Sequence, residues 1–258
     1  MPVAIGHVEA IFRYPVKSMR GDPLKVANLG WHGIEGDRRL AFQRMEDRGG
    51  FPWLSASKLP GLLRFSPCRS ESEADSQPDG LPTHVRTPDG KDLPVFGAEL
   101  AAEVGRRYGA PVQMMHLRHG IFDDASISVI ASETVREAGR LAGLDPDPRR
   151  FRPNIVVRLL RPVPFQEDEW LGGVLSFGEA ESAPAIAVTM RDVRCAMLNL
   201  DPVTAIPAPE MMKAVVRANQ NTAGIYGAVT RIGRIEVGQA IFFHAKARSI
   251  SERAPIGV

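Results

Sequence analysis

Short segments in which apolar and polar residues alternate, separated by turn residues, recur along most of the chain and restrict it to a β-rich fold. Over 7–16, for example, Val8, Phe12 and Tyr14 alternate with Glu9. A period of two residues is typical of a strand with one buried face. We also predict strands over 24–29, 40–44, 127–131, 155–160, 169–177, 185–193, 225–231 and 234–244. We predict one hairpin over 83–96 and another with its turn at Gly233.

Three segments instead carry the spacing of amphipathic helices. They cover 98–108, 133–142 with Ser132 as the N-cap, and 209–218, which begins with a proline. The sequence therefore predicts a mixed, β-rich (α+β) fold. With 258 residues the chain is long enough for two domains, and the first helix falls where the first of them would close. We expect domains over 1–110 and 111–258, with a mobile polar loop over 70–80 in the first.

Composition excludes several classes of protein. A net charge of +2 gives no reason to expect a nucleic-acid or membrane partner. Two cysteines, Cys68 and Cys195, are too few for a disulfide framework, a four-thiolate iron-sulfur cluster or a cysteine-rich zinc site. No apolar run has the length of a signal peptide core or a membrane helix, so we expect a cytoplasmic protein.

Cys195 is the residue most suggestive of chemistry. It lies in the segment 190–202 between apolar runs, with Arg191 and Arg194 before it and Asp201-Pro202 after it. Neighbouring guanidinium groups lower the pKa of a thiol, and the thiolate is both a nucleophile and a ligand for soft metals. A free cysteine is more often a small buried apolar residue, and this segment alone leaves that alternative open.

Basic and hydroxyl side chains also gather at predicted strand ends and loops. Planar guanidinium groups, and a lysine beside a hydroxyl, suit a bound phosphate, although any single arginine is more often a solvated surface charge. The set comprises Lys17, Ser18, Arg38, Arg39, Ser126, Arg149, Arg150, Arg152, Asn154, Arg191 and Arg194. The combination predicts an anionic ligand. In contrast, Ser55-Ala56-Ser57-Lys58 spells the S-x-x-K motif of penicillin-recognising enzymes without its companion motifs, so we do not expect that activity.

Several short motifs occur in a fixed order along nearly the whole chain. They are Tyr14-Pro15-Val16-Lys17-Ser18, Gly36-Asp37-Arg38, Asp124-Ala125-Ser126, Arg150-Phe151-Arg152-Pro153-Asn154-Ile155-Val156, Arg194-Cys195 with Asp201-Pro202, and Ile235-Glu236-Val237-Gly238. In this order the chain resembles MOSC-domain proteins, a family named after the C-terminal domain of molybdenum cofactor sulfurase. It most resembles the bacterial relatives of the mitochondrial amidoxime-reducing component. The resemblance implies an N-terminal β-barrel domain packed on a β-barrel MOSC domain.

The resemblance also implies a molybdenum-pterin cofactor, with the Cys195 thiolate as the protein ligand of the metal. The positions that match cofactor-holding residues of the family are Lys17, Ser18, Arg38, Ser126, Arg152, Asn154, Arg194 and Tyr226. Asp201 is a candidate for proton transfer beside Cys195, and equally a turn residue before proline. Where relatives often carry small hydroxyl residues, this chain has Leu198 and Asn199. That departure concerns the substrate more than the cofactor.

The expected function is that of a molybdenum-dependent oxidoreductase that removes an oxygen atom from N-hydroxylated or N-oxide small molecules. The chain has no G-x-G-x-x-G segment and too few cysteines for an iron-sulfur cluster, so electrons would come from a separate ferredoxin-like protein or flavoprotein. An alternative is a sulfur carrier that uses a Cys195 persulfide, or a module that stores and delivers the cofactor.

Overall fold

The structure is a computed structural model that describes residues 2–47, 49–69 and 80–245. The predicted mobile loop lies, except for Gly80, outside the described residues. Within the described ranges, no helix has the length and apolar character needed to cross a membrane.

Seven strands close into a barrel, which confirms the mixed, β-rich fold class. Hydrogen bonds link them in the order β11, β10, β14, β13, β12, β16 and β1, and β1 pairs back onto β11. Only the pair β10 and β11 is parallel. The bounds are β1 Val3–Arg13, β10 Ile127–Ala131, β11 Ile155–Leu159, β12 Val174–Phe177, β13 Ala185–Val193, β14 Thr222–Arg231 and β16 Ala240–His244.

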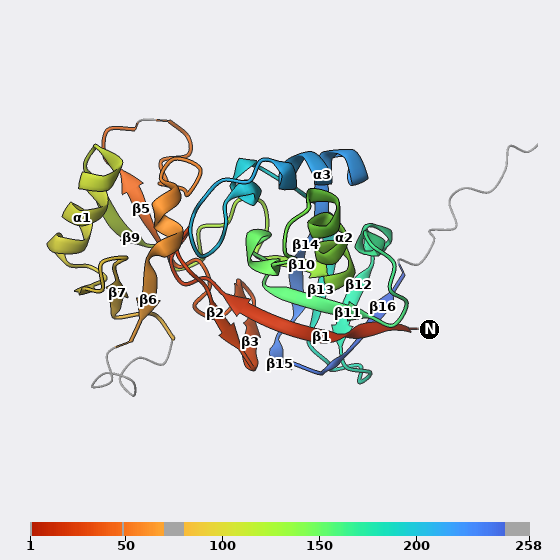
Figure 1. Cartoon of the computed structure of the whole chain (residues 1–258). Helices are drawn as coiled ribbons and strands as arrows, with labels where there is room; N and C mark the ends of the chain where they lie inside the picture. The colour runs from red at the N-terminus through yellow and green to blue at the C-terminus, as the bar shows by residue number, and fades with distance from the viewer. Residues whose placement is uncertain (1, 48, 70–79, 246–258) are drawn as a thin grey trace, which may run out of the picture.

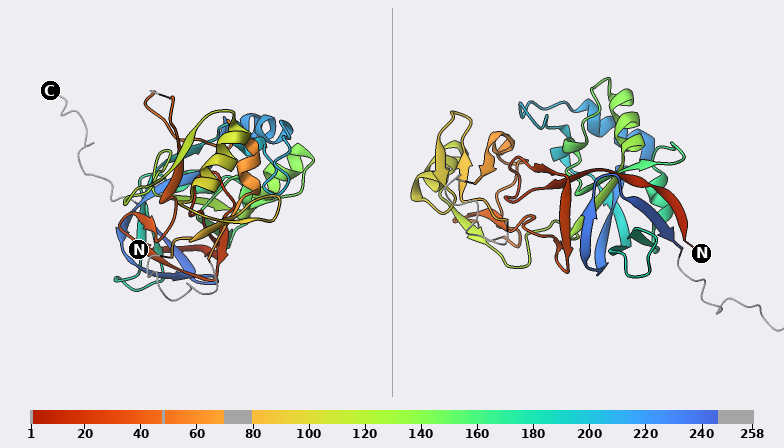
Figure 2. Two further views of the ribbon diagram at one scale, coloured as in Figure 1. Left: turned by 90° about the vertical axis from the view of Figure 1, so that its left-hand side faces the viewer. Right: turned by 90° about the horizontal axis from the view of Figure 1, so that it is seen from below.

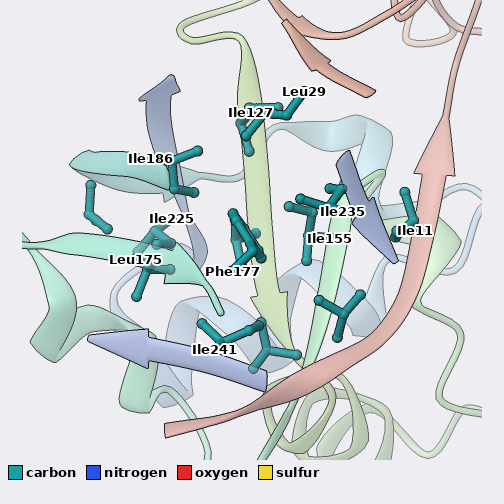
Figure 3. Packing of buried hydrophobic residues seen from close by; sticks show 14 of the residues in the cluster. Ile11, Leu29, Ile127, Ile155, Leu175, Phe177, Ile186, Ile225, Ile235 and Ile241 are labelled. Atoms are coloured by element: carbon teal, nitrogen blue, oxygen red, sulfur yellow. The ribbon is translucent and has the colours of Figure 1, made fainter. Parts of the chain in front are cut away.

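Branched apolar side chains fill the barrel, as Figure 3 shows for Ile127, Ile155, Ile225 and Ile241, all fully buried. Helices α2 (Ser132–Ala142) and α3 (Glu210–Asn219) cover its outer face. Their apolar sides pack on β10 and β11 in a second cluster. These two strands are therefore buried on both faces, which explains their almost unbroken apolar sequence.

The rest of the chain forms smaller sheets, and Figure 1 shows them with α1 (Ala98–Tyr108) at the end of the molecule away from α2 and α3. The view from below in Figure 2 separates the same two parts. Two of these sheets lie near α1. One pairs β5 (Leu40–Arg44) with β9 (Val112–His116), and the second joins β6 (Ser66–Cys68), β7 (His84–Arg86) and β8 (Asp92–Pro94). The family resemblance implies a β-barrel in this first unit, whereas its described strands form two separate small sheets. The predicted hairpin is present as β7 and β8.

The N-terminal strands belong to the second unit rather than the first. β1 lies in the closed barrel, β2 (Asp22–Leu24) pairs with β1, and β3 (Val26–Gly30) pairs with both β4 (Gly33–Ile34) and β15 (Gly233–Glu236). The sheets therefore do not divide at residue 110, and the division into domains at that point stays a prediction.

Three local predictions were wrong. The strand expected over 169–177 begins at Val174, because Gln166–Trp170 forms a 3₁₀-helix and Gly172 has a φ of +77°. The expected hairpin at Gly233 does not form, since β14 pairs with β10 and β13 while β15 crosses to β3. Ser132 is the first residue of α2, and Ala131 occupies the N-cap position.

Candidate functional site

A cavity of about 260 Å³ lies where the barrel meets the first unit, and Cys195 lines it. Cys195 lies two residues after the end of β13 and directly before a short 3₁₀-helix over Ala196–Asn199. It is exposed. The wall opposite the barrel includes Phe51, Ser55 and Ser57, from the segment that follows β5. Both halves of the chain thus contribute to one cavity.

The structure brings most of the predicted site residues to this cavity. Those that line it are Lys17, Ser18, Arg38, Arg152, Arg194, Cys195 and Tyr226, together with Arg150. Ser126, Asn154 and Asp201 are not among the lining residues. Their cofactor and catalytic roles stay predictions, but Asn154 and Asp201 form hydrogen bonds with residues that line the cavity.

Asn154 holds Arg38. It is 1% exposed, and its Oδ1 accepts hydrogen bonds from Arg38 Nη1 at 3.3 Å and from the amide of Ser128 at 3.1 Å. Its Nδ2 donates to the carbonyl of Phe12 at 3.3 Å. Because Asn154 joins β1, β10 and the start of β11, it fixes the Arg38 guanidinium relative to the barrel.

Ser126 and Asp201 contact the backbone of neighbouring residues. The carbonyl of Ser126 approaches Gly33 so closely that a Cβ there would lie 2.6 Å from it, and Gly33 has a φ of +94°. Asp201 accepts bonds from the amides of Val203 and Thr204 and from Arg150 Nη2 at 2.9 Å. Burial raises the pKa of Asp201, but these hydrogen bonds outweigh burial and lower it. Asp201 is therefore an ionised turn residue.

The cationic side of the cavity has donors left to satisfy. Arg152 Nη2 and Arg150 Nε are buried and have no hydrogen-bond partner among the described residues. Burial lowers the pKa of Arg152 to about 10, and its guanidinium lies 4.1 Å from the ring centroid of Tyr14. A buried guanidinium without a carboxylate is costly unless an anion joins it.

Lys17 is the other buried cation. It is 6% exposed, and its Nζ donates to Asp123 Oδ1 at 2.7 Å. Burial lowers the pKa of Lys17, and the neighbouring Arg38 and Arg152 lower it further, against the opposing effect of Asp123. The three cations thus destabilise one another, and an added anion would relieve this repulsion.

Arg194, which the resemblance predicts to hold the cofactor, has its donors engaged by the protein itself. Its Nε and Nη1 donate to the carbonyls of Ala223 and Phe151, each at 2.7 Å, and Nη2 pairs with Asp192 at 2.8 Å. Gly224 makes room for this arrangement, because a Cβ there would lie 3.0 Å from Arg194 Nη2 and the residue has a φ of +84°. Arg194 therefore braces the chain on either side of the cavity.

Three lining residues carry backbone strain. Ser18, Arg38 and Arg152 have φ values of +64°, +50° and +51°, in the left-handed region that non-glycine residues rarely adopt. Such conformations cost of order 1 kcal/mol each and gather at functional sites. The strain aims the three side chains into one cavity.

Replacing Ser18 with glycine is expected to raise the melting temperature by about 2–4 °C, because it releases roughly 1 kcal/mol of backbone strain. Ser57→Gly is the control, since Ser57 lines the same cavity without a positive φ. That variant should melt slightly lower than wild type because glycine has more conformational freedom in the unfolded chain. Calorimetry on the wild type and the two variants tests this prediction. Equal decreases in the melting temperatures of both variants would show that Ser18 is not strained.

Sequence reasoning missed the residue that pairs with Arg194. Asp192 is 2% exposed and lines the cavity, whereas Arg191 points outward to an ion pair with Asp168 at 3.3 Å. Alternation along β13 could have revealed this, because 192 and 194 share one face of the strand and 191 lies on the other. Ser55, Ser57 and Phe51 gave no comparable signal, since their segment carries no periodic pattern.

Comparisons with known proteins agree with this architecture. Residues 116–242 match the family described as the MOSC domain. Among solved structures, the YUAD protein from Bacillus subtilis shares the fold with a TM-score of 0.52 and 14% sequence identity, covering 96% of this chain and 100% of that chain. YiiM from Geobacillus stearothermophilus is 20% identical over 46% of this chain and 54% of that chain, with a TM-score of 0.36. A search of curated proteins gave no significant match. Because the family match runs from β10 to β14, reaches into β16 and includes the Cys195 segment, residues 116–242 of this chain form a MOSC domain.

Proposed function

We propose that the cavity binds a molybdenum-pterin cofactor, with the Cys195 thiolate as the protein ligand of the metal. The observation that carries the proposal is the meeting of an exposed thiol with a cationic cluster from both halves of the chain in one cavity. Thiolates suit soft metal centres, and guanidinium and ammonium groups suit the phosphate of the pterin.

The residues present fit this group. The unpartnered Arg152 Nη2 and Arg150 Nε need an acceptor, and a phosphate offers several. Lys17 and Arg38 would add charge on the same side, and Ser18 and Tyr226 would face the polar edge of the pterin. Arg194 and Asn154 would act indirectly, by positioning the segments on which Cys195 and Arg38 lie.

When bound, the cofactor supplies two-electron oxygen-atom transfer, which no side chain of this protein provides. We propose that it serves the reduction of N-hydroxylated or N-oxide small molecules, following the resemblance to the amidoxime-reducing branch. Electrons would come from a separate ferredoxin-like protein or flavoprotein in the cytoplasm. Leu198 lines the cavity and Asn199 Oδ1 accepts the amide of Met212, so the departure from the hydroxyl pattern makes this wall more apolar.

The test is the molybdenum content of protein made in a cofactor-producing host, measured by elemental mass spectrometry. We expect near-stoichiometric molybdenum in the wild type and a loss of most of it in Cys195→Ala. Cys68→Ala is the matched control, because Cys68 lies on β6 and outside the cavity, and it should keep its metal. Loaded protein should then oxidise a reduced viologen when an N-hydroxylated amidine is added.

A second function is favoured by the exposure of Cys195, which leaves its sulfur accessible to a persulfide donor. A sulfur carrier or a cofactor storage module would use the same residue. Absence of molybdenum from all three proteins, with a persulfide on Cys195 in mass spectra, would replace the oxidoreductase proposal by the carrier. Metal that is bound but released to an acceptor protein without substrate turnover would indicate storage and delivery.

A further inference from the structure

Asp192 is a buried carboxyl on the cavity wall to which neither the family resemblance nor the proposed function gives a role. It lies near the end of β13, three positions before Cys195, and both residues line the same cavity. With 2% of its surface exposed, it is a costly group to place there.

One oxygen of this carboxyl is held by the protein. Asp192 Oδ2 accepts a hydrogen bond from Ser128 Oγ at 3.0 Å and pairs with Arg194 Nη2 at 2.8 Å. Ser128 comes from β10 and Arg194 from the segment after β13. The carboxyl group is therefore fixed from two sides.

The other oxygen is different. Asp192 Oδ1 has no hydrogen-bond partner among the described residues, and it is not among their fully buried unpaired atoms. Because Asp192 is a lining residue, Oδ1 is the carboxyl oxygen left to interact with a molecule in the cavity. A fixed carboxyl with one free oxygen toward a cavity is suited to giving and taking a proton.

We propose that Asp192 holds and delivers a proton to the substrate in the Cys195 cavity, with Ser128 and Arg194 as its positioning residues. The inference rests on the proposed function and names the residue that serves it.

The overall reduction of an N-hydroxylated compound breaks the N–O bond and consumes two electrons and two protons, leaving the amine or amidine and water. The two electrons come from the separate ferredoxin-like protein or flavoprotein of the proposed function. Asp192 gives one proton to the oxygen that leaves and recovers it from solvent through the open cavity. The second proton comes from solvent.

The electrostatic surroundings support this role. Burial raises the pKa of Asp192 to about 6, although Arg194 and, more weakly, Arg38 oppose the shift. Asp124 acts in the same direction as burial, and Asp192 in turn contributes to the raised pKa of Tyr226. A carboxyl that titrates just below neutral pH can both give up and regain its proton under cellular conditions.

Other carboxyls near the cavity lack one of these properties. Asp201 is ionised and engaged in a turn, and it does not line the cavity. Asp123 and Asp124 line it, but both are exposed to solvent, and Asp123 is paired with Lys17. Asp192 alone among these four combines burial with a free oxygen.

The first experiment follows alkylation of Cys195 by iodoacetamide in cofactor-free full-length protein, in a Cys68→Ser background, from pH 5 to pH 8. Ionisation of Asp192 places a negative charge on the wall of the cavity that the Cys195 thiol also lines, which disfavours the thiolate. As the pH rises through 6, we expect the alkylation rate of the wild type to fall about threefold below the rate expected if no other group titrated near Cys195. Asp192→Asn should remove this inflection. Ser128→Ala should move it to higher pH, because the variant loses a hydrogen bond to the charged form.

Asp168→Asn is the matched control, since Asp168 also pairs with an arginine of β13 but does not line the cavity. It should keep the wild-type inflection. A wild-type profile without an inflection, or an inflection that survives in Asp192→Asn, overturns the proposal.

The second experiment measures N-reduction by molybdenum-loaded protein as a function of pH. Asp192→Asn should lose about 100-fold in kcat together with the limb of the profile near pH 6, with Asp168→Asn unchanged. A loaded Asp192→Asn that keeps wild-type kcat overturns the role of Asp192. If wild type itself is inactive, the proposed reduction fails, and the alkylation profile still decides whether Asp192 exchanges a proton at this cavity.

Discussion

Arg194→Met is expected to lower the free energy of unfolding by about 3–5 kcal/mol, the largest stability effect that we predict for a single substitution. The guanidinium is 9% exposed, neutralises Asp192, and donates to the carbonyls of Ala223 and Phe151. Methionine fills a similar volume but leaves a buried carboxylate and two buried carbonyls without their donor. The decrease in the free energy of unfolding should be greater at pH 8 than at pH 5. At the lower pH Asp192 is protonated, and a neutral carboxyl depends less on the missing guanidinium.

Urea unfolding followed by fluorescence at both pH values measures this effect. Arg191→Met is the matched control, since Arg191 lies three residues earlier and its side chain, which pairs with Asp168, is 42% exposed. Exposed pairs contribute about 0–1 kcal/mol, so this variant should remain close to wild type. Equal losses in the two variants would show that Arg194 does not hold the buried network.

Glu167 should make the protein less stable as the pH rises from 5 to 8. This carboxyl is 0% exposed, accepts from Thr134 Oγ1 at 2.8 Å and the amide of Ala131 at 3.4 Å, and has no cationic partner among the described residues. Burial raises its pKa from 4.5 to about 7. The folded protein therefore keeps a proton that the unfolded chain loses, and folding becomes less favourable between pH 4.5 and 7.

The expected loss is at most about 3 kcal/mol, as one pKa unit corresponds to roughly 1.4 kcal/mol. The pKa of Asp192 is also raised, so both carboxyls make the stability of the wild type depend on pH in the same direction. The contribution of Glu167 is therefore the difference between the wild type and a Glu167 variant. Glu167→Gln should be markedly less sensitive to pH than wild type in thermal melts at pH 5, 6, 7 and 8. Glu137→Gln, which changes a partly exposed carboxyl on α2, should follow the wild-type curve. A Glu167→Gln curve parallel to wild type would contradict the prediction.

The barrel strands were predictable from sequence where burial imposes a local pattern. β1 alternates because one face packs inside the barrel, and β10 and β11 are continuously apolar because α2 and α3 cover their outer face. The pairing of the strands was harder to predict from the sequence. β15 lies within reach of β14 along the chain, yet Ile235 is buried against the barrel core and β15 pairs with β3, some two hundred residues away. No local pattern encodes that choice.

The site shows a similar division. Cys195, Lys17 and Arg152 stood out because their chemistry and order are unusual for a surface, and the fold brings them to one cavity. Asp192 did not, because a single aspartate within a strand looks like an outward-facing residue until its neighbours on the same face are known. Phe51 reaches the cavity only through tertiary packing, which the sequence of its own segment does not reveal.

The closure of the barrel by β1 also constrains how the protein can be made. β1 pairs with β11 and β16, so Val3 lies opposite Phe243 and Gly6 opposite Leu159. On the ribosome, the first strand emerges long before either partner exists, and the sheet keeps two open edges until the last strand has been synthesised. Contacts so distant in sequence slow folding and expose strand edges to other chains. Assembly of the cavity, which needs Lys17 and Ser18 beside Cys195, is therefore a late step that waits for nearly the entire chain.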